Sequence, residues 1–549
     1  MRAILLGAAC LVLLTIGALP FLVFLDAVPL QPDSIKWIES AVPGGEGWAE
    51  WTFRGSHFVG YRPLTALSFT ADLALFGPSA SALRWTDLAL HLLSALLVFG
   101  LSFTLGRGGA QDHPRSRVPA AVAGLAALTW FALHVGNDEV IPFLSRRSYP
   151  LAVCLAFAGL LLAQRAAART STTGPGVLGR LSAALVGPLL LASLWGNELG
   201  ALLAVALPFV VFAAAAESPI RRSVLLTAWG WAWIAAGIWI RQRVLDGDSG
   251  YEVVAAEPGR AAAVWKLYGT ALTGQLGQAS MLHAGAAAAL ASYYAVTCIA
   301  LARERARSLP LGLLVVLGLY GAVVANEGVW FPRQVYPATA LAAVAFGLVA
   351  AYTLAGSAAV VLRLPRWAHA IPQVALLLLM VVESPIVQGT ATVRAERARV
   401  ATSFTQALAQ ELESLTGAAE VLAVAPVPGP VDETRLDPRA SLRASSDRST
   451  ARLSAMRVPF RWLRLVFDGS EWKLRDVLYV ADPDEQHPPT YEASEAQLRL
   501  PAGAVAYGVP RRQILELPSG QPTFSLPKQQ TPDLPRYLWI YGSPGLQAL

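Results

Sequence analysis

The sequence contains few cysteines and few charged residues, and both shortages narrow the class of protein. Only three of the 549 residues are cysteines (Cys10, Cys154 and Cys298), and each lies in an apolar segment. This placement excludes a disulfide framework and a cysteine-rich metal site. Charged residues make up 15% of the chain, against about 25% in an average soluble protein. Such a composition excludes a disordered chain, a coiled coil and an ordinary soluble protein.

Concentrated positive charge and several catalytic motifs are also missing. The 43 Lys and Arg residues exceed the 37 Asp and Glu residues by only six, and they form no basic run. A general nucleic-acid binder is therefore excluded. The histidines show neither H-x-x-x-H nor H-E-x-x-H spacing, and no Gly-rich phosphate loop or G-x-S-x-G string occurs. These absences disfavour a zinc hydrolase, an ATP-driven pump and a serine hydrolase.

Apolar residues are abundant, at 54% of the chain. They gather in segments of about 17 to 25 residues, the length that crosses roughly 30 Å of hydrocarbon. The sequence therefore predicts a polytopic α-helical membrane protein with about 11 transmembrane helices. The first segment is longer than the core of a signal peptide, which favours a membrane anchor. The predicted spans are 4–25, 83–105, 118–135, 149–163, 181–194, 199–215, 224–240, 286–301, 311–324, 335–355 and 368–382.

Arginines support this order of spans because they occur in alternate connections. They lie in the connections 107–117, 165–180, 221–222, 303–307 and 363–366. Positive side chains collect on the cytoplasmic side, so all five connections are cytoplasmic if the N-terminus is cytoplasmic. An odd number of spans then places the chain after the last span outside the cytoplasm.

The C-terminal region has the pattern of a small α+β domain. An amphipathic stretch at 393–415 has helical spacing, and the apolar run 421–425 suggests a strand. Apolar residues alternate around Asp468-Gly469 between 462 and 474, which predicts a β-hairpin. The predicted division is a membrane domain at 1–385, with a long first outer loop at 26–82, and an extracytoplasmic α+β domain at 386–549.

The first outer loop contains a candidate general base. Asp26 directly follows the first apolar span. At that depth a carboxylate is partly desolvated, which strengthens it as a proton acceptor. The alternative is a solvated carboxylate at a helix end. The same loop contains Asp33, Tyr61 and Arg62, and its tryptophans also fit an interfacial helix with an aromatic belt.

The second outer loop contains two acids and two arginines: Asp138, Glu139, Arg146 and Arg147. Charges in a short loop between spans are costly unless they pair with each other or with a charged ligand. The guanidinium fork of arginine suits phosphate oxygens. The loop therefore predicts either internal ion pairs or a phosphate clamp.

Two further connections carry single candidates. Glu198 lies in a tight turn between apolar segments, where it either serves a helix N-terminus or faces a pocket. Arg333 and Tyr336 lie at the outer end of a late span. Arg333 either snorkels to the membrane surface or binds a ligand.

Together these strings resemble a known superfamily. They are an acid after the first span, Tyr61-Arg62-Pro63-Leu64-Thr65, His91 in the second span, Phe131-Ala132-Leu133-His134 with Glu139 and Arg147, and Arg333-Gln334-Val335-Tyr336-Pro337. Their order resembles the GT-C superfamily of integral-membrane glycosyltransferases, in particular bacterial relatives of the transmembrane and tetratricopeptide-repeat O-mannosyltransferases. The likeness covers roughly the first 350 residues in fragments.

The resemblance implies a GT-C-like enzyme of the bacterial inner membrane and cell envelope. Such an enzyme transfers a sugar from a polyprenyl-phosphate donor to an acceptor hydroxyl on a protein, lipid or polysaccharide, with inversion. It implies a catalytic Asp26, with Asp33, Asp138, Glu139 and Glu198 as alternative or auxiliary acids. The donor phosphate would be bound by Arg62, Arg147 and Arg333, and the substrate pocket would contain Tyr61, His91, His134 and Tyr336.

The chain also departs from that family. Two adjacent acids are usual after the first span, but Ala27 follows Asp26, so Asp33 stays a candidate base. Val135 replaces the usual proline after His134, and no tetratricopeptide repeats follow. No metal ligand set is predicted, although a divalent cation is compatible with the family. A transporter or flippase of a lipid-linked sugar and an inactive scaffold are the alternative functions.

Overall fold

The chain forms two compact units in the computed structural model. Residues 1–25 and 29–391 make up the first unit, and residues 26–28 and 392–549 make up the second. The structure describes residues 2–25, 37, 41, 48–54, 60–77, 79–108, 117–168, 177–214, 220–245, 292–302, 308–326, 332–354, 371, 373–374, 410–411, 419–426, 460–467, 472–481, 490–492, 497–499, 505–508, 513–515, 523–525, 535–540 and 547–548.

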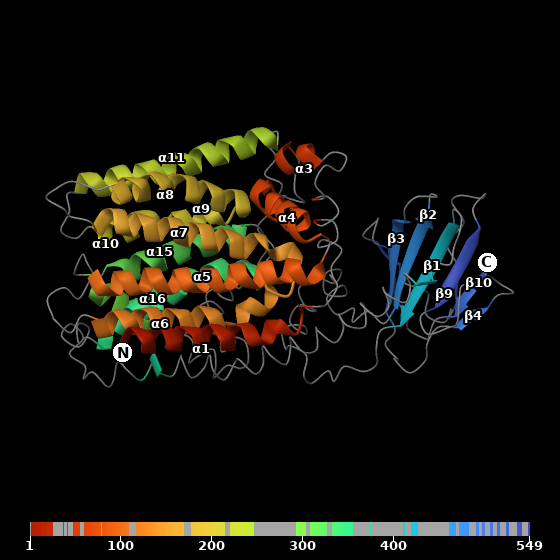
Figure 1. The fold of residues 1–549 in the computed structure, drawn as a ribbon, viewed down its shortest axis with the longest axis horizontal. Helices are drawn as coiled ribbons and strands as arrows, with labels where there is room; N and C mark the ends of the chain where they lie inside the picture. Colours follow the sequence, from red (N-terminus) through yellow and green to blue (C-terminus); the bar gives the residue numbers. More distant parts are fainter. Residues whose placement is uncertain are drawn as a thin grey trace. The chain divides into compact units, whose positions relative to one another are not determined.

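The first unit is a bundle of helices that run side by side (Figure 1). Its α-helices are α1 (Arg2–Leu22), α3 (Trp48–Arg54), α4 (Pro63–Phe76), α5 (Ala80–Gly108), α6 (Arg117–Leu133), α7 (Ser148–Ala168), α8 (Val177–Gly196), α9 (Gly200–Ala204), α10 (Leu207–Ala214), α11 (Ile220–Val244), α15 (Leu309–Asn326) and α16 (Val335–Leu354). In the described part of this unit, three 3₁₀ helices connect them: η1 (Val135–Glu139), η2 (Leu144–Arg146) and η4 (Pro332–Gln334).

Seven of the described helices are long and apolar enough to cross a membrane. These segments are Ile4–Leu22, Ser81–Arg107, Pro119–Asp138, Leu144–Ala168, Val177–Gly196, Ile220–Val244 and Val335–Thr353. Many large apolar side chains on them are exposed, such as Ile4 at 75% and Leu178 at 68%. Exposed apolar surface of this extent suits hydrocarbon rather than water. The chain is therefore a multi-pass membrane protein.

Seven predicted spans coincide with these seven helices, but the predicted total of eleven is not reached in the described part of the chain. The predicted span 199–215 is interrupted at 205–206, between α9 and α10. Pro208 explains the break, because it has no N–H for a bond to the Ala204 carbonyl. The span 311–324 coincides with α15, whose apolar part, Leu309–Val323, is shorter than the seven helices above. The span 286–301 is described only from 292, and 368–382 lies outside the described residues except for 371, 373 and 374.

The core of the bundle surrounds α16, whose apolar window is completely buried. It packs against α5, α6, α7 and α15. Small side chains let these backbones approach closely, as is usual between membrane helices. At Gly347, for example, α16 lies so close to α6 that an added Cβ would overlap the Ala123 carbonyl oxygen.

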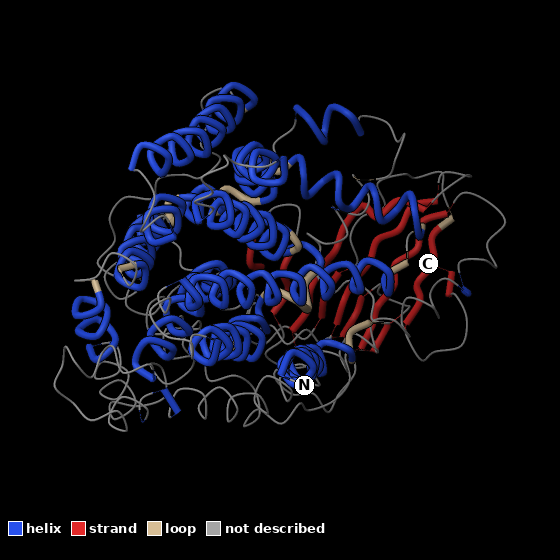
Figure 2. The backbone as a smooth tube through the Cα atoms, turned by 60° about the vertical axis from the view of Figure 1, so that its left-hand side comes forward, coloured by secondary structure: helices blue, strands red, loops and turns tan. Residues whose placement is uncertain are grey.

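The second unit contains β-sheets (Figure 2, red). A seven-stranded sheet has the order β10-β9-β1-β2-β3-β6-β7, and a three-stranded sheet has the order β4-β5-β8. Strand β1 pairs parallel to β9, and all other pairs are antiparallel. The strands are β1 (Ala419–Pro426), β2 (Phe460–Phe467), β3 (Trp472–Ala481), β4 (Thr490–Glu492), β5 (Gln497–Arg499), β6 (Val505–Gly508), β7 (Gln513–Leu515), β8 (Thr523–Ser525), β9 (Arg536–Ile540) and β10 (Gln547–Ala548).

The predicted hairpin around Asp468-Gly469 coincides with β2 and β3, in which Phe467 is opposite Trp472. The register shifts between Arg464 and Leu465, which indicates a β-bulge. The predicted amphipathic helix at 393–415 lies outside the described residues except for 410 and 411. The helical part of the α+β domain, the domain boundary at 385 and the extracytoplasmic location therefore stay predictions.

Candidate functional site

Four segments that are far apart in the sequence meet at one end of the helical unit. We call this region the polar end; it comprises residues 60–65, 134–149, 196–199 and 332–336. The Thr65 hydroxyl donates to the Gly196 carbonyl at 2.7 Å, and the Asn197 amide donates to Ser148 Oγ at 3.0 Å. These bonds join the start of α4 to the α8–α9 turn, and that turn to the start of α7.

Arg62 and Glu198 form a two-point ion pair across the polar end. Arg62 Nε lies 2.9 Å from Glu198 Oε2, and Nη2 lies 2.5 Å from Oε1. Their side chains are 12% and 15% exposed. Gly60 leaves room for the carboxylate, because a Cβ there would lie 3.2 Å from Glu198 Oε2. Two predicted site residues are thus in direct contact.

Asn197, the neighbour of Glu198, forms a local hydrogen bond at the start of α9. Asn197 Oδ1 accepts a hydrogen bond from the Leu199 N–H at 3.0 Å. Leu199 is the N-cap residue of α9. The carboxylate of Glu198 is directed to Arg62.

Arg147 is buried in a network of its own, with 1% of the residue exposed. Its Nη1 lies 2.7 Å from Asp72 Oδ2, and its Nε donates to Asp87 Oδ1. Its Nη2 donates to the Leu83 carbonyl at 2.7 Å, and the guanidinium lies 4.0 Å from the centre of the Phe69 ring. The carboxylates that pair with Arg147 therefore come from α4 and α5, not from its own loop as the internal-pair hypothesis required.

Arg84 of α5 forms further contacts close to the Arg147 network. Its Nη1 donates to the Pro142 carbonyl at 2.9 Å, and its guanidinium lies 5.8 Å from the centre of the Phe24 ring. Asp72, Arg84 and Asp87 are not among the candidate residues predicted from the sequence. Arg84 and Asp87 lie within a predicted span, and ionisable residues inside a span signal a buried partner.

His91 and Tyr336 join α5 to α16 in the interior. The Tyr336 hydroxyl lies 3.0 Å from His91 Nδ1, and neither residue is exposed to solvent. The rings of Phe21 and Phe131 surround His91 at centroid distances of 6.1 and 5.5 Å. His91 Nε2 has no hydrogen-bond partner among the described residues. The two predicted pocket residues therefore form one buried polar pair.

The loop after α6 is fixed by its own side chains. His134 is the N-cap residue of η1, and its Nδ1 accepts from the Gly136 N–H at 2.9 Å. The Asn137 amide donates to the Phe131 carbonyl at 2.7 Å. Asp138 is 3% exposed within η1. Glu139 ends η1, and its side chain lies outside the described part.

Tyr61 and Arg333 complete the predicted set. The buried Tyr61 hydroxyl donates to the Phe53 carbonyl at 3.2 Å. Burial raises the pKa of the Tyr61 phenol above its usual range, so the group remains a donor at neutral pH. Arg333 is partly buried and donates from Nε to the Tyr149 hydroxyl at 3.2 Å.

Asp26 and Asp33, the two candidate bases in the first loop, lie outside the described residues. The described chain leads to Asp26 as far as Leu25, and Phe21 and Phe24 place this part of the chain against His91 and Arg84. Among the described residues, no three His, Cys, Asp or Glu side chains lie close enough together to hold a metal ion.

The fold and the site define a multi-pass membrane protein with a charged polar end.

No family model matches the sequence, and no curated protein matches it. Two solved structures are similar. The apo crystal structure of ArnT from Cupriavidus metallidurans shares 15% identity over 72% of this chain and 74% of its own, with a TM-score of 0.38. The structure of that ArnT bound to undecaprenyl phosphate shares 14% identity over 90% and 96%, with a TM-score of 0.39. Identities and TM-scores this low do not assign this chain to a family.

Proposed function

We propose that the protein is a GT-C-like membrane glycosyltransferase. It moves a sugar from a polyprenyl-phosphate donor to an acceptor hydroxyl at the polar end, which faces the outside of the cytoplasmic membrane. One observation carries the proposal: the segments whose strings resemble the superfamily, around Arg62, His134 and Arg333, belong to one contiguous polar end. Strings scattered over the sequence thus lie together in space, as one active site requires.

Arg62 and Arg333 are the groups we assign to the donor phosphate. A departing phosphate carries negative charge and needs cationic stabilisation more than a general acid. Glu198 holds the guanidinium of Arg62 in a fixed orientation, and partial exposure leaves Arg62 accessible. We assign Arg147 a structural role, because two carboxylates and two carbonyls already accept its hydrogen bonds or pair with it.

Asp26 is the proposed general base, with Asp33 as the second candidate. The base takes the proton of the acceptor hydroxyl while the acceptor oxygen bonds to the anomeric carbon. The bond between that carbon and the phosphate oxygen breaks on the opposite side, and polyprenyl phosphate leaves as an anion. One direct displacement inverts the anomeric centre. Asp138 and Glu139 of η1 are proposed as auxiliary acids.

A transporter of a lipid-linked sugar would use the same arginines but would need charged groups near the middle of the bilayer. In the seven candidate spans, every Asp, Glu, Lys and Arg lies within about two turns of a helix end. This distribution favours chemistry at the membrane surface over passage through the membrane.

The decisive experiment measures release of free polyprenyl phosphate from a polyprenyl-phosphate sugar in the presence of an envelope extract. We expect turnover by the wild type, none by Asp26→Asn, and near wild-type turnover by the matched control Asp33→Asn. Full activity of Asp26→Asn would move the base to Asp33 or Glu139. No turnover by the wild type with any of several donor sugars, together with movement of the labelled lipid between leaflets, would replace the transferase with a transporter.

A further inference from the structure

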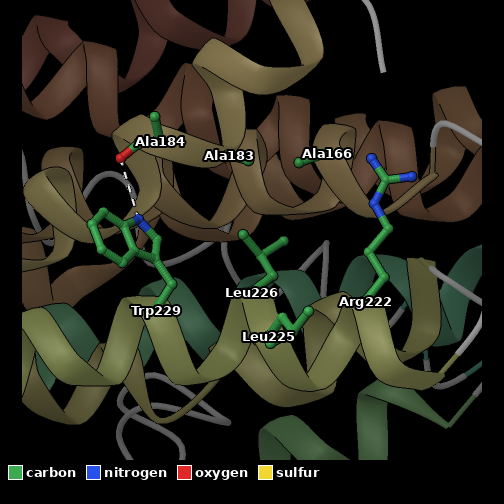
Figure 3. Close-up of a pocket in the computed structure, with 7 residues that line it drawn as sticks. All are labelled: Ala166, Ala183, Ala184, Arg222, Leu225, Leu226 and Trp229. Carbon is green, nitrogen blue, oxygen red and sulfur yellow. Dashed lines mark hydrogen bonds between the residues drawn. The ribbon is translucent and has the colours of Figure 1, made fainter. Parts of the chain in front are cut away.

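An apolar groove lies at the end of the helical unit opposite to the polar end, between α7, α8 and α11 (Figure 3). Its volume is about 320 Å³. The lining residues are Ala166, Ala183, Ala184, Arg222, Leu225, Leu226 and Trp229. Six of the seven are apolar, and Arg222 is the one charged residue in this lining.

The groove has two distinct ends. The Trp229 indole N–H donates to the Ala184 carbonyl at 3.3 Å and closes one of them. Arg222 lies at the other end, seven residues earlier in α11, so the groove is about 10 Å long. The alanines of α7 and α8 leave space between them and the leucines of α11. Beyond Trp229 this space is filled, because a Cβ on Gly230 would lie 3.1 Å from Leu190.

The surface around the groove faces hydrocarbon. Leu181 on α8 and Val224 on α11 are 52% and 58% exposed, and Leu225 in the groove itself is 60% exposed. In a multi-pass membrane protein such side chains contact lipid. An occupant of the groove therefore enters from the bilayer rather than from water.

Several arginines lie at the end of the helical unit where the groove is found, and Arg222 is the one that lines the groove. Arg222 lies in the first turn of α11, next to Arg221. Arg180 in the first turn of α8 and Arg165 in the last turn of α7 are exposed at the same end of the bundle. The guanidinium fork matches phosphate oxygens, and basic pockets between membrane helices bind anionic head groups.

We propose that this groove binds an anionic phospholipid of the leaflet at the arginine-rich face. One acyl chain lies along the three alanines and Leu225 up to Trp229, and the phosphate is held by Arg222. This site is separate from the proposed sugar-transfer site, and it does not depend on that function.

Native mass spectrometry of the full-length protein in detergent tests the site. The protein is mixed with equal amounts of phosphatidylglycerol and phosphatidylcholine. We expect the wild type to retain phosphatidylglycerol, and Arg222→Gln to retain about fivefold less, since one arginine at a lipid surface contributes about 1 kcal/mol. Ala183→Leu, which fills the groove, has the same effect. Arg222→Lys preserves binding, and the matched control Arg221→Gln retains lipid as the wild type does.

Three results would overturn the proposal. Equal retention of both phospholipids would show that Arg222 does not select a head group. Equal losses in Arg221→Gln and Arg222→Gln would indicate a diffuse charged surface without a groove site. Displacement of phosphatidylglycerol by an equal amount of polyprenyl phosphate would assign the groove to that lipid. If Ala183→Leu fails to fold, the difference in phosphatidylglycerol retention between Arg222→Gln and Arg222→Lys tests the proposal without it.

Discussion

At the scale of single residues, Arg147 is the side chain whose loss we expect to cost most stability. Replacing it with glutamine removes the cation that pairs with both Asp72 and Asp87, which are buried. Removing one partner of a buried ion pair typically destabilises by about 3 to 5 kcal/mol. We expect Arg147→Gln to lower the free energy of unfolding in detergent by that amount. Lysine restores little, because one ammonium cannot replace the planar fork.

The neighbouring arginine provides the matched control for this prediction. Arg146 is only partly buried, and its guanidinium lies 4.2 Å from the centre of the Phe143 ring. A contact of this kind contributes about 0.5 to 1 kcal/mol. Because the Arg146 side chain is partly solvated and does not join two buried carboxylates, Arg146→Gln should lower the free energy of unfolding by less than Arg147→Gln does. Equal losses at the two positions would mean that the buried network does not stabilise the fold.

Substitutions of Arg62 and Glu198 can distinguish a role in binding the donor phosphate from a purely structural role. If Arg62 binds the donor phosphate, Arg62→Gln removes a charged hydrogen bond worth about 1.5 to 3 kcal/mol and raises the donor KM about 10- to 100-fold. Glu198→Gln keeps the cation, so its donor KM should change by less than about threefold. Steady-state kinetics with varied donor concentration measure both. Equal increases in KM would assign the pair a purely structural role.

The sequence could predict the candidates of the polar end but not their partners. Arg62, His134 and Arg333 were identifiable because each lies in a string that resembles a family. The two partners of Arg147 were not identifiable in this way, because Asp72 and Asp87 lie in other segments. Only the packing of α4 and α5 places these carboxylates next to Arg147. The pairing of Arg62 with Glu198, 136 residues apart, is equally invisible in one sequence.

At the scale of elements, the contact between α6 and α16 depends on a missing side chain. A Cβ at Gly347 would overlap the Ala123 carbonyl oxygen, a backbone atom that cannot rotate away. Forced overpacking costs about 1 to 3 kcal/mol. We expect Gly347→Ala to lower the unfolding temperature in detergent. Gly7→Ala in α1 is the control, because nothing lies within 4 Å of a Cβ there, and it should leave stability unchanged or slightly raised.

The positions of the long helices could be predicted from the lengths of the apolar segments. The break within the segment 199–215 depends on a single residue. The long, predominantly apolar runs of α5, α8 and α16 are recognisable from composition. The run at 199–215 has the same composition, yet Pro208 ends α9 early and starts α10. Helix α4 was not predicted as a separate helix, because 14 residues are too few to cross a membrane.

At the scale of the whole molecule, the remaining prediction is the side of the membrane on which each part lies. Arginines in alternate connections predict that the end of α7 is cytoplasmic, and an odd number of spans places the β-sheet unit outside. Ala168 and Ala548 are exposed positions in these two regions. We expect a membrane-impermeant maleimide to label Ala548→Cys on intact cells, and Ala168→Cys only after lysis.

The wild type serves as the blank in this experiment, because Cys154 and Cys298 are buried and Cys10 is partly buried. If both introduced cysteines are protected on intact cells, the number of spans between Ala168 and Ala548 is even rather than odd. One of the predicted spans at 286–301 or 368–382 would then not cross. The β-sheet unit would lie on the cytoplasmic side, where it could not meet an acceptor at the polar end, and any role for it in acceptor binding would be excluded.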